Sequence, residues 1–498
     1  MKSLTLSLFT ILFLGLCTIG FAQNEKPSQW CGSEYPAEMI PYLQQASESA
    51  RNLESRTSGG PYTLPLDIHV FQNDDNGNGG MSIKRVNNVV CETIEKFEEY
   101  GIEMYLNKVE FITNPSYNEN PHTQSGIINL LYANNTNAVD IFVHNVSGET
   151  LCGVYKGFVI GQQVTGDPDI VQVSQSCWSP STLIHELGHY LGLPHTFSGL
   201  EGTGNNCNKR LFNREKVDGS NCSTTGDMIC DTPPDYHSDR WGCTGCIQID
   251  PDSVTFRPDP NNYMSYAGDN CVNLFSNNQV SVMKFIVDEL RQDLLQNTPP
   301  DLTPITEAVQ LIQPGQDDEK PFDVVSFKWS SVPGASSYYF EINRQASFNS
   351  ALILESATVT TTSYISTELN PNQTYHWRVI PFNNARPCLS DDITASGSFS
   401  TNDIAIGVED VEGLESFDIF PNPAKNNQSF FVTLQSKENM AGDLQVYNVN
   451  GQLVHHQNIQ VEASVNSYSV DVQDLPAGLY VIHLEFEEGT VQKKLIIN

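Results

Sequence analysis

The segment between residues 185 and 195 constrains this chain more than any other, because it places metal-binding side chains at helical spacing. A helix is expected from Ser179 to Leu193, and His185 and His189 are four residues apart on it, so both would face one metal ion. Glu186 would then lie beside the open side of that ion. Gly192 can adopt a positive φ, which would end the helix and bring His195 round as a third ligand. Three imidazoles with a free fourth position are typical of catalytic zinc, whereas a helix with unrelated histidines requires none of this spacing.

The histidine pattern resembles that of the metzincin peptidases, which also carry a methionine turn beneath the metal. Met264 stands about 70 residues after His195 and fits that turn. The resemblance implies that Met264 packs under the three histidines without binding the metal. Without the histidine motif, the same methionine would be interpreted as core packing.

Finer features make the segment from about 60 to 290 resemble the pappalysin family, whose bacterial members include cytophagalysin-like proteins. This resemblance implies a secreted zinc-dependent endopeptidase. It is carried by three groups of residues, which are His195-Thr196-Phe197, Gly226-Asp227-Met228-Ile229-Cys230-Asp231-Thr232-Pro233 and Asn262-Tyr263-Met264-Ser265-Tyr266.

The chemistry implied by the family uses zinc, which lowers the pKa of its bound water to about 7. Glu186 would act as the general base, taking a proton from that water and passing it to the departing nitrogen. Tyr266 matches a tyrosine that stabilises the oxyanion in relatives; the alternative is an aromatic side chain that only packs.

Relatives also use calcium to brace the loops below the cleft. Asp227, Asp231 and Thr232 stand where such ligands would be, and hard oxygen ligands suit this ion. A solvated turn or a helix cap is the alternative interpretation of the same residues.

The chain has twelve cysteines, of which Cys17 would leave with an N-terminal signal peptide. In an exported protein the other eleven are mainly disulfides, and the odd number leaves at least one free thiol. The resemblance implies the pairs Cys207–Cys246 and Cys243–Cys271, with Cys222–Cys230 as a further local bridge. The sequence assigns no partners to a second group of cysteines, which are Cys91, Cys152, Cys177 and Cys388.

Cys31 has two interpretations. Its thiolate could occupy the open zinc position as a cysteine switch until a pro-segment, residues 23–57, is cut away. A structural disulfide is the alternative. Arg51 and Arg56 flank the expected end of the pro-segment and are candidate cleavage points.

The first 22 residues predict a secretory signal peptide, because Lys2 precedes an apolar run from Leu4 to Phe21 and small Ala22 precedes polar Gln23. A membrane anchor is the alternative for this run, and no other segment is long enough to span. The formal charge of −33 argues against nucleic acid as a partner.

With 498 residues the chain is expected to form several domains. Strand and helix patterns alternate in residues 58–297, which predicts an α/β or α+β catalytic domain. A proline-rich linker follows at 298–304. Residues 308–402 resemble a fibronectin type III β-sandwich, with Trp329 in its core and Tyr375 at a tyrosine corner.

The final segment, residues 414–498, carries four short motifs, which are Phe420-Pro421-Asn422-Pro423-Ala424, Val446-Tyr447-Asn448-Val449-Asn450-Gly451, Leu475-Pro476-Ala477-Gly478-Leu479-Tyr480-Val481 and Lys493-Lys494-Leu495-Ile496-Ile497. With these motifs it resembles the C-terminal sorting domain of type IX secretion, a second small β-sandwich. The resemblance rests on four short motifs in order at the C-terminus, and a second adhesion sandwich is the alternative. It implies the type IX secretion machinery as a partner and a location outside the cell or at its surface.

The sequence thus predicts a secreted zinc endopeptidase with protein or peptide substrates and no transmembrane segment in its mature form. Residues 152–161 could supply the edge strand that aligns an extended peptide, although no residue indicates which side chain is preferred. The alternative function is a surface adhesion protein whose zinc domain is inactive.

Overall fold

The computed structural model describes most of the chain. Helices and strands are given below for residues 31, 33, 35, 37–51, 62–74, 77–119, 137–145, 152–160, 163–322, 325–349, 352–367, 369–402, 411, 413–425, 429–448, 453–471, 475–487 and 489–497. The expected signal peptide at 1–22 and the cleavage candidate Arg56 lie outside these residues. Arg51 ends a helix, but its side chain is not among those described.

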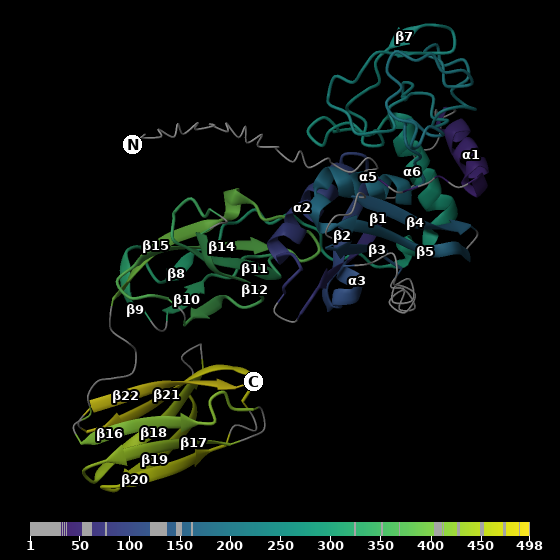
Figure 1. The fold of residues 1–498 in the computed structure, drawn as a ribbon. Helices are drawn as coiled ribbons and strands as arrows, with labels where there is room; N and C mark the ends of the chain where they lie inside the picture. The colour runs from purple at the N-terminus through teal and green to yellow at the C-terminus, as the bar shows by residue number, and fades with distance from the viewer. Residues whose placement is uncertain are drawn as a thin grey trace, which may run out of the picture.

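A five-stranded sheet in the order β2-β1-β3-β5-β4 organises the first half of the chain (Figure 1). Neighbouring strands are parallel except for β4, which pairs antiparallel with β5 and forms one edge. The elements are β1 (Tyr62–Gln72), β2 (Ile102–Thr113), β3 (Val139–His144), β4 (Gly153–Ile160) and β5 (Gln163–Ser174), with a short helix α3 (Pro115–Glu119) after β2. The expected edge strand at 152–161 is therefore β4.

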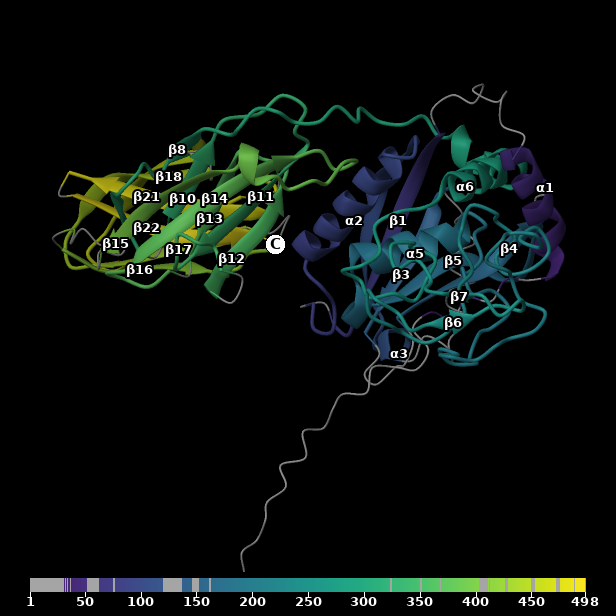
Figure 2. The ribbon, with the colours of Figure 1, turned by 90° about the horizontal axis from the view of Figure 1, so that it is seen from above.

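Helices cover the sheet and its edge because each has an apolar face. In β1 the alternate residues Leu66, Ile68 and Val70 enter the main core, as the two-residue period of a strand requires. The helices are α1 (Ile40–Arg51) after a 3-10 turn η1 (Ala37–Met39), α2 (Ile83–Glu98), α5 (Pro180–Tyr190) after η3 (Gln175–Cys177), and α6 (Asn277–Leu290) followed by η4 (Gln292–Gln296). Both views place α1 beside α6 (Figures 1 and 2). Met39 and Leu43 of the N-terminal segment are buried in the same core.

The segment between α5 and α6 has little regular structure, only β6 (Gln248–Ile249) paired with β7 (Thr255–Phe256). Disulfides cross-link these loops. The structure pairs Cys207–Cys246, Cys222–Cys230 and Cys243–Cys271. These are the three pairs that the family resemblance implies.

The middle part of the chain contains two sheets that share one hydrophobic core, in which Trp329 and Tyr375 are buried. The Tyr375 hydroxyl accepts a hydrogen bond from the Asn370 N–H at 2.9 Å, so it ties the strand to the chain just upstream. The elements are β8 (Leu311–Gln313), β9 (Asp318–Pro321), β10 (Val325–Trp329), β11 (Ser337–Asn343), β12 (Ile353–Val359), β13 (Ser363–Ser366), β14 (Thr374–Phe382), η6 (Asp391–Ile393) and β15 (Ala395–Asn402).

The last part also has two sheets around a core of their own, in the orders β16-β17-β20 and β19-β18-β21-β22. Its elements are β16 (Leu414–Phe420), β17 (Phe430–Ser436), β18 (Met440–Asn448), β19 (Leu453–Val461), β20 (Val465–Val470), β21 (Gly478–Phe486) and β22 (Gly489–Ile497). None of the helices in the described part of the chain is long and apolar enough to cross a membrane.

A disulfide joins the helix α2 of the first part to the middle part, through Cys91 and Cys388. Nearby, Glu341 is fully buried and accepts ion pairs from Lys84 of α2 at 3.3 Å and from Arg378 at 2.8 Å. Two cations around one buried carboxylate offset the cost of removing it from water. Covalent and ionic contacts thus fix the middle part against α2. A separate disulfide, Cys152–Cys177, lies within the first part of the chain.

Candidate metal centre

Helix α5 presents the first two histidines of the motif. It begins after Ser179, whose hydroxyl accepts a hydrogen bond from the Thr182 N–H, and Pro180 occupies the first turn. His185 and Glu186 have no exposed surface, so the helix lies inside the fold rather than on it. The sequence predicted a helix from 179 to 193, but α5 ends at Tyr190 because the chain turns at Gly192.

Gly192 makes this turn with a φ of +88°, a conformation that L side chains rarely adopt. Space also requires glycine, since a Cβ here would lie 2.6 Å from Cγ1 of Ile286. The turn returns the chain under the helix and brings His195 next to His189, with 3.1 Å between their Nε2 atoms.

The proton positions on the histidine rings are fixed by backbone carbonyls. Nδ1 of His185 lies 2.6 Å from the Tyr263 carbonyl oxygen, and Nδ1 of His189 lies 2.8 Å from that of Leu193. A carbonyl only accepts, so each Nδ1 carries the proton and each Nε2 presents a lone pair. The Nε2 atoms of these two rings are 3.1 Å apart. Facing lone pairs repel unless a cation lies among them, so the three-imidazole donor set fits zinc.

Burial supports the same charge state. It lowers the pKa of His185 and His189 well below the ordinary value, and the neighbouring His195 lowers both further. Neutral imidazole is the form that binds a metal. The ring of His195 stacks on Phe197 with centroids 4.6 Å apart, and its Nδ1 lies 3.7 Å from Oε1 of Glu201.

Met264 lies directly against α5. It is fully buried, and a Cβ on Gly188 would be 2.5 Å from its sulfur. The Met264 N–H donates to Oδ1 of Asn262 at 2.8 Å, and the amides of Asn262 and Gln279 bond to each other at 2.8 and 3.2 Å. Because the neighbouring Tyr263 carbonyl holds His185, this network positions a metal-facing ring as well as the methionine.

The N-terminal segment enters the same centre. The Cys31 sulfur and one ring nitrogen from each of the three histidines all lie within 4.8 Å of one another. Tyr266 donates a hydrogen bond from its hydroxyl to the Cys31 carbonyl at 2.8 Å and accepts one from the Cys31 N–H at 3.3 Å. The Ser33 hydroxyl donates to Oε2 of Glu186 at 3.2 Å. Burial raises the pKa of the Cys31 thiol well above its ordinary value, and the charge of Glu186 adds to the rise.

Comparison with known proteins gives the family of this centre. Residues 170–288 match the family model described as pregnancy-associated plasma protein-A. Pappalysin-1 of Mus musculus is 28% identical over 231 residues, which are 43% of this chain and 12% of that protein. The chain carries a pappalysin-type metallopeptidase domain. This part of the chain thus has the mixed α/β fold of a metzincin-like domain, and the residues after it form further β-sheets.

Fungal relatives of the pappalysin-type domain are named for secretion. An extracellular metalloprotease of Arthroderma benhamiae is 30% identical over 128 residues, 25% of this chain and 35% of that enzyme. Extracellular metalloprotease 1 of Coccidioides posadasii is 22% identical over 300 residues, 56% of this chain and 97% of that enzyme. The chain therefore spans about a third or less of the length of the first two relatives.

A second family model, described as the secretion system C-terminal sorting domain, matches residues 418–498. This segment forms the sheets of β16 to β22. The tail marks the chain for type IX secretion, so the protein is extracellular or held at the cell surface.

The expected calcium ligands lie in the disulfide-bonded loops of the pappalysin-type domain. Asp227 is buried and accepts hydrogen bonds from the Thr232 hydroxyl at 2.8 Å and the Ile229 N–H at 2.9 Å. Asp231 instead accepts from the Ser276 hydroxyl and the Asn278 N–H at the start of α6, so its carboxylate serves as a helix cap.

Sequence reasoning missed Glu215, which lies beside Asp227 in these loops. A Cβ on Gly226 would be 2.3 Å from its Oε2, so its carboxylate packs against that backbone. Burial raises the pKa of Glu215 to about 9 and that of Asp227 to about 8, and the charges of nearby acidic groups, including Asp235, contribute. Glu215 matches no short motif, so only the folded loops reveal it.

Two residues around the histidines were missed for the same reason. Ser33 reaches Glu186 across 153 positions of sequence. Glu201 lies beside His195; burial acts to raise the pKa of its carboxyl, but this ring and nearby backbone N–H groups together hold the pKa below the ordinary value. The sequence offered a signal only for Ser33, through its place two residues after Cys31.

Proposed function

We propose that this chain is a secreted zinc-dependent endopeptidase. The observation that carries the proposal is the convergence of three imidazole rings whose Nε2 atoms face one point, with Glu186 buried on the same helix. When bound, zinc would polarise the peptide carbonyl and make water acidic enough to lose a proton near neutral pH. His185, His189 and His195 would hold it.

The other residues of the centre divide the remaining work. Glu186 accepts the proton of the attacking water and delivers it to the departing nitrogen. Tyr266 offers its hydroxyl as a hydrogen-bond donor to the carbonyl oxygen as negative charge develops there. Burial keeps this hydroxyl protonated, because it raises the pKa of Tyr266 far above the ordinary value. Met264 supports α5 from below.

The N-terminal segment keeps this centre latent in our proposal. Cys31 lies where the fourth ligand of a metal would be, and the same segment bonds to both Glu186 and Tyr266. Three contacts therefore occupy the metal position, the base and the oxyanion donor at once. This supports the cysteine switch over a structural disulfide, since Cys31 is the free cysteine among the described residues.

Strand β4 is proposed as the edge that aligns an extended substrate. The Cys31 backbone already forms a parallel bridge to Gly153, the first residue of β4. The edge can thus bind added chain through backbone hydrogen bonds, which is how extended peptides are recognised by sheets. The N-terminal segment occupies this edge, so it must leave before a substrate can bind.

The boundaries between the domains are also proposals. We divide the chain into a signal peptide at 1–22, a pro-segment at 23–57, a catalytic domain at 58–297, a fibronectin type III-like domain at 308–402 and a sorting domain at 414–498. The paired sheets around the cores of Trp329 and of Leu444 support two β-sandwiches. Peptides or proteins are the expected substrates, and the type IX machinery is the expected export partner.

One experiment separates the peptidase from an inactive adhesion protein. Processed wild-type enzyme is compared with Glu186→Ala in a protein-substrate gel, with and without a chelator. The zinc content per chain is measured for both proteins. The proposal expects one zinc per chain in both proteins, with cleavage only by the wild type and only without chelator. Cleavage by Glu186→Ala at the wild-type rate would show that Glu186 is not the general base.

A further inference from the structure

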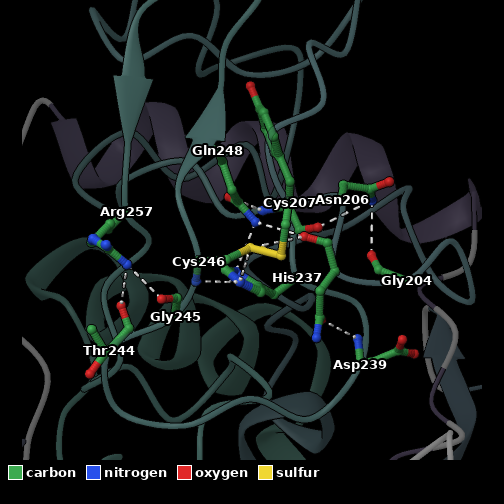
Figure 3. The surroundings of a disulfide bond; sticks show 12 residues. Gly204, Asn206, Cys207, His237, Asp239, Thr244, Gly245, Cys246, Gln248 and Arg257 are labelled. Atoms are coloured by element: carbon green, nitrogen blue, oxygen red, sulfur yellow. Dashed lines mark hydrogen bonds between the residues drawn. A yellow bond between two sulfur atoms is a disulfide. The ribbon is translucent and has the colours of Figure 1, made fainter.

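The disulfide Cys207–Cys246 lies at a surface pocket of about 350 Å³. Its two residues differ in exposure, because Cys207 is exposed while Cys246 is partly buried. The ring of His237 lies beside the disulfide (Figure 3), with Nε2 at 3.2 Å from the Cys246 sulfur. His237 itself is 1% exposed and stacks on Trp241 with centroids 4.6 Å apart, so its ring is held in place.

The hydrogen bonds of Gln248 determine where the ring proton is. The side-chain oxygen of Gln248 accepts from the Tyr236 N–H at 2.9 Å, which turns its amide nitrogen toward His237. That nitrogen lies 2.8 Å from Nδ1 of the ring and can only donate. Nδ1 is therefore the acceptor, and the proton of a neutral ring is on Nε2.

Nε2 has a second neighbour, the Cys246 N–H, at 3.2 Å. If Nε2 accepted from this N–H, the ring proton would sit on Nδ1 and face the amide hydrogens of Gln248 at 2.8 Å. Oδ1 of Asp235 also lies 3.4 Å from Nδ1, but this oxygen already accepts the His237 backbone N–H at 2.9 Å. The shortest of the three contacts is the one of 2.8 Å to the fully buried Gln248 amide, and it places the ring proton on Nε2. This proton then points at the Cys246 sulfur.

We propose that Cys207 is a modification site for low-molecular-weight monothiols, such as a cysteine-containing tripeptide. Thiol–disulfide exchange depends on access to one sulfur and on stabilisation of the other as it leaves. The incoming thiolate attacks the sulfur of Cys207, the more exposed residue of the pair, a new S–S bond forms there, and the Cys207–Cys246 bond breaks. The bonding electron pair goes to Cys246, whose thiolate accepts a hydrogen bond from Nε2–H of His237. The incoming thiol is joined to Cys207, and no further oxidant or reductant is needed.

Two of the other disulfides lack this combination of features or oppose it. Near Cys91–Cys388 the carboxylate of Glu95 lies 3.8 Å from the Cys388 sulfur, and its negative charge disfavours a leaving thiolate. Cys222–Cys230 lies in the same loop-rich region, and its Cys222 is 8% exposed. The opening rate of Cys222–Cys230 therefore serves as an internal reference for a general loosening of these loops.

The experiment incubates the full chain with reduced glutathione at neutral pH for short times. Free thiols are then alkylated, and each cysteine is identified by peptide mass spectrometry. We expect glutathione on Cys207 and the alkyl group on Cys246. The initial rate of opening should exceed that of Cys222–Cys230 by about tenfold or more. Glutathione on Cys246 instead, or equal opening rates of the two disulfides, would overturn the proposal.

Two substitutions at one position test the role of the ring proton. His237→Gln can place an amide donor near the Nε2 position, whereas the shorter side chain of His237→Asn reaches only the Nδ1 position. We expect His237→Asn to lower the Cys207–Cys246 opening rate about tenfold relative to Cys222–Cys230, and His237→Gln to retain most of it. An unchanged ratio in His237→Asn contradicts the assignment. If the asparagine variant does not fold, the position of glutathione in the wild type still decides.

Discussion

The Ser33 hydroxyl donates a hydrogen bond to Glu186 across 3.2 Å, although 153 residues separate the two in sequence. Cys31 lies two positions earlier and faces the three histidines. One short segment therefore approaches both Glu186 and the three histidines. This arrangement predicts that residues 31–33 hold the enzyme inactive.

Cys31→Ala in the full-length chain should therefore raise peptidase activity without processing. We expect at least a tenfold increase, measured as the initial rate on a quenched peptide library, because the variant removes the thiol from the metal position. Ser33→Ala removes a single hydrogen bond and should raise the rate only a few-fold. If Cys31 were purely structural, Cys31→Ala would lower thermal stability and leave full-length activity at the wild-type level.

Tyr266→Phe should have opposite effects on the two forms of the enzyme. In the processed form the lost donor should lower kcat about a hundredfold with little change in KM, since the bond matters most in the transition state. In the full-length form the same change removes the hydroxyl that bonds Cys31, so latency should weaken. If Tyr266 only packs, the phenylalanine variant will match the wild type in kcat.

Calcium should matter most at alkaline pH, because of the buried carboxyls of Glu215 and Asp227. Their folded pKa values are about 9 and about 8, against ordinary values of 4.5 and 3.8. At pH values between the ordinary and the folded pKa of each group, the folded chain binds more protons than the unfolded chain. Stability without a cation therefore falls as pH rises from about 4 to 9. A calcium ion held by Asp227, Thr232 and Glu215 would supply the missing positive charge.

Thermal melts test this relation in buffers with EGTA or with millimolar calcium. With EGTA we expect Tm to be lower at pH 8.5 than at pH 6 by on the order of 5 °C, and calcium should restore it. Glu215→Gln removes one of the two charges and should flatten the pH dependence. A Tm that is insensitive to calcium at pH 8.5 would leave Asp227 and Thr232 as a hydrogen-bonded turn.

The sequence predicts the close approach of the three histidines because the features that bring them together are local. His185 and His189 belong to one helix, and Gly192 sets the turn that delivers His195. Such relations depend on helical spacing and on one backbone conformation, so the sequence contains them. The helix was predicted three residues too long, because the turn begins before the glycine that requires it.

Relations between distant segments could not be predicted in the same way. The Cys91–Cys388 disulfide spans 297 positions, and Glu215 meets Asp227 only through the packing of loops. Cys91 and Cys388 were left without assigned partners because cysteine spacing alone does not select one partner among many. The burial of Leu43 in the main core was also missed, since the apolar pattern of α1 does not indicate which surface it covers.

Gly192→Ala offers a sharp test of the turn that completes the centre. Two costs are expected, namely strain at a φ of +88° and a contact of 2.6 Å between the new Cβ and Ile286. Gly202→Ala is a matched control, because Gly202 has a φ of +71° and nothing lies within 4 Å of its Cβ position. Strain alone costs about 1–2 kcal/mol, so the control should lose a few degrees of Tm and keep its zinc. Gly192→Ala should lose more stability than the control and bind zinc at least tenfold more weakly, because the turn also positions His195. Equal losses in the two variants would show that the close approach to Ile286 contributes nothing to the metal centre.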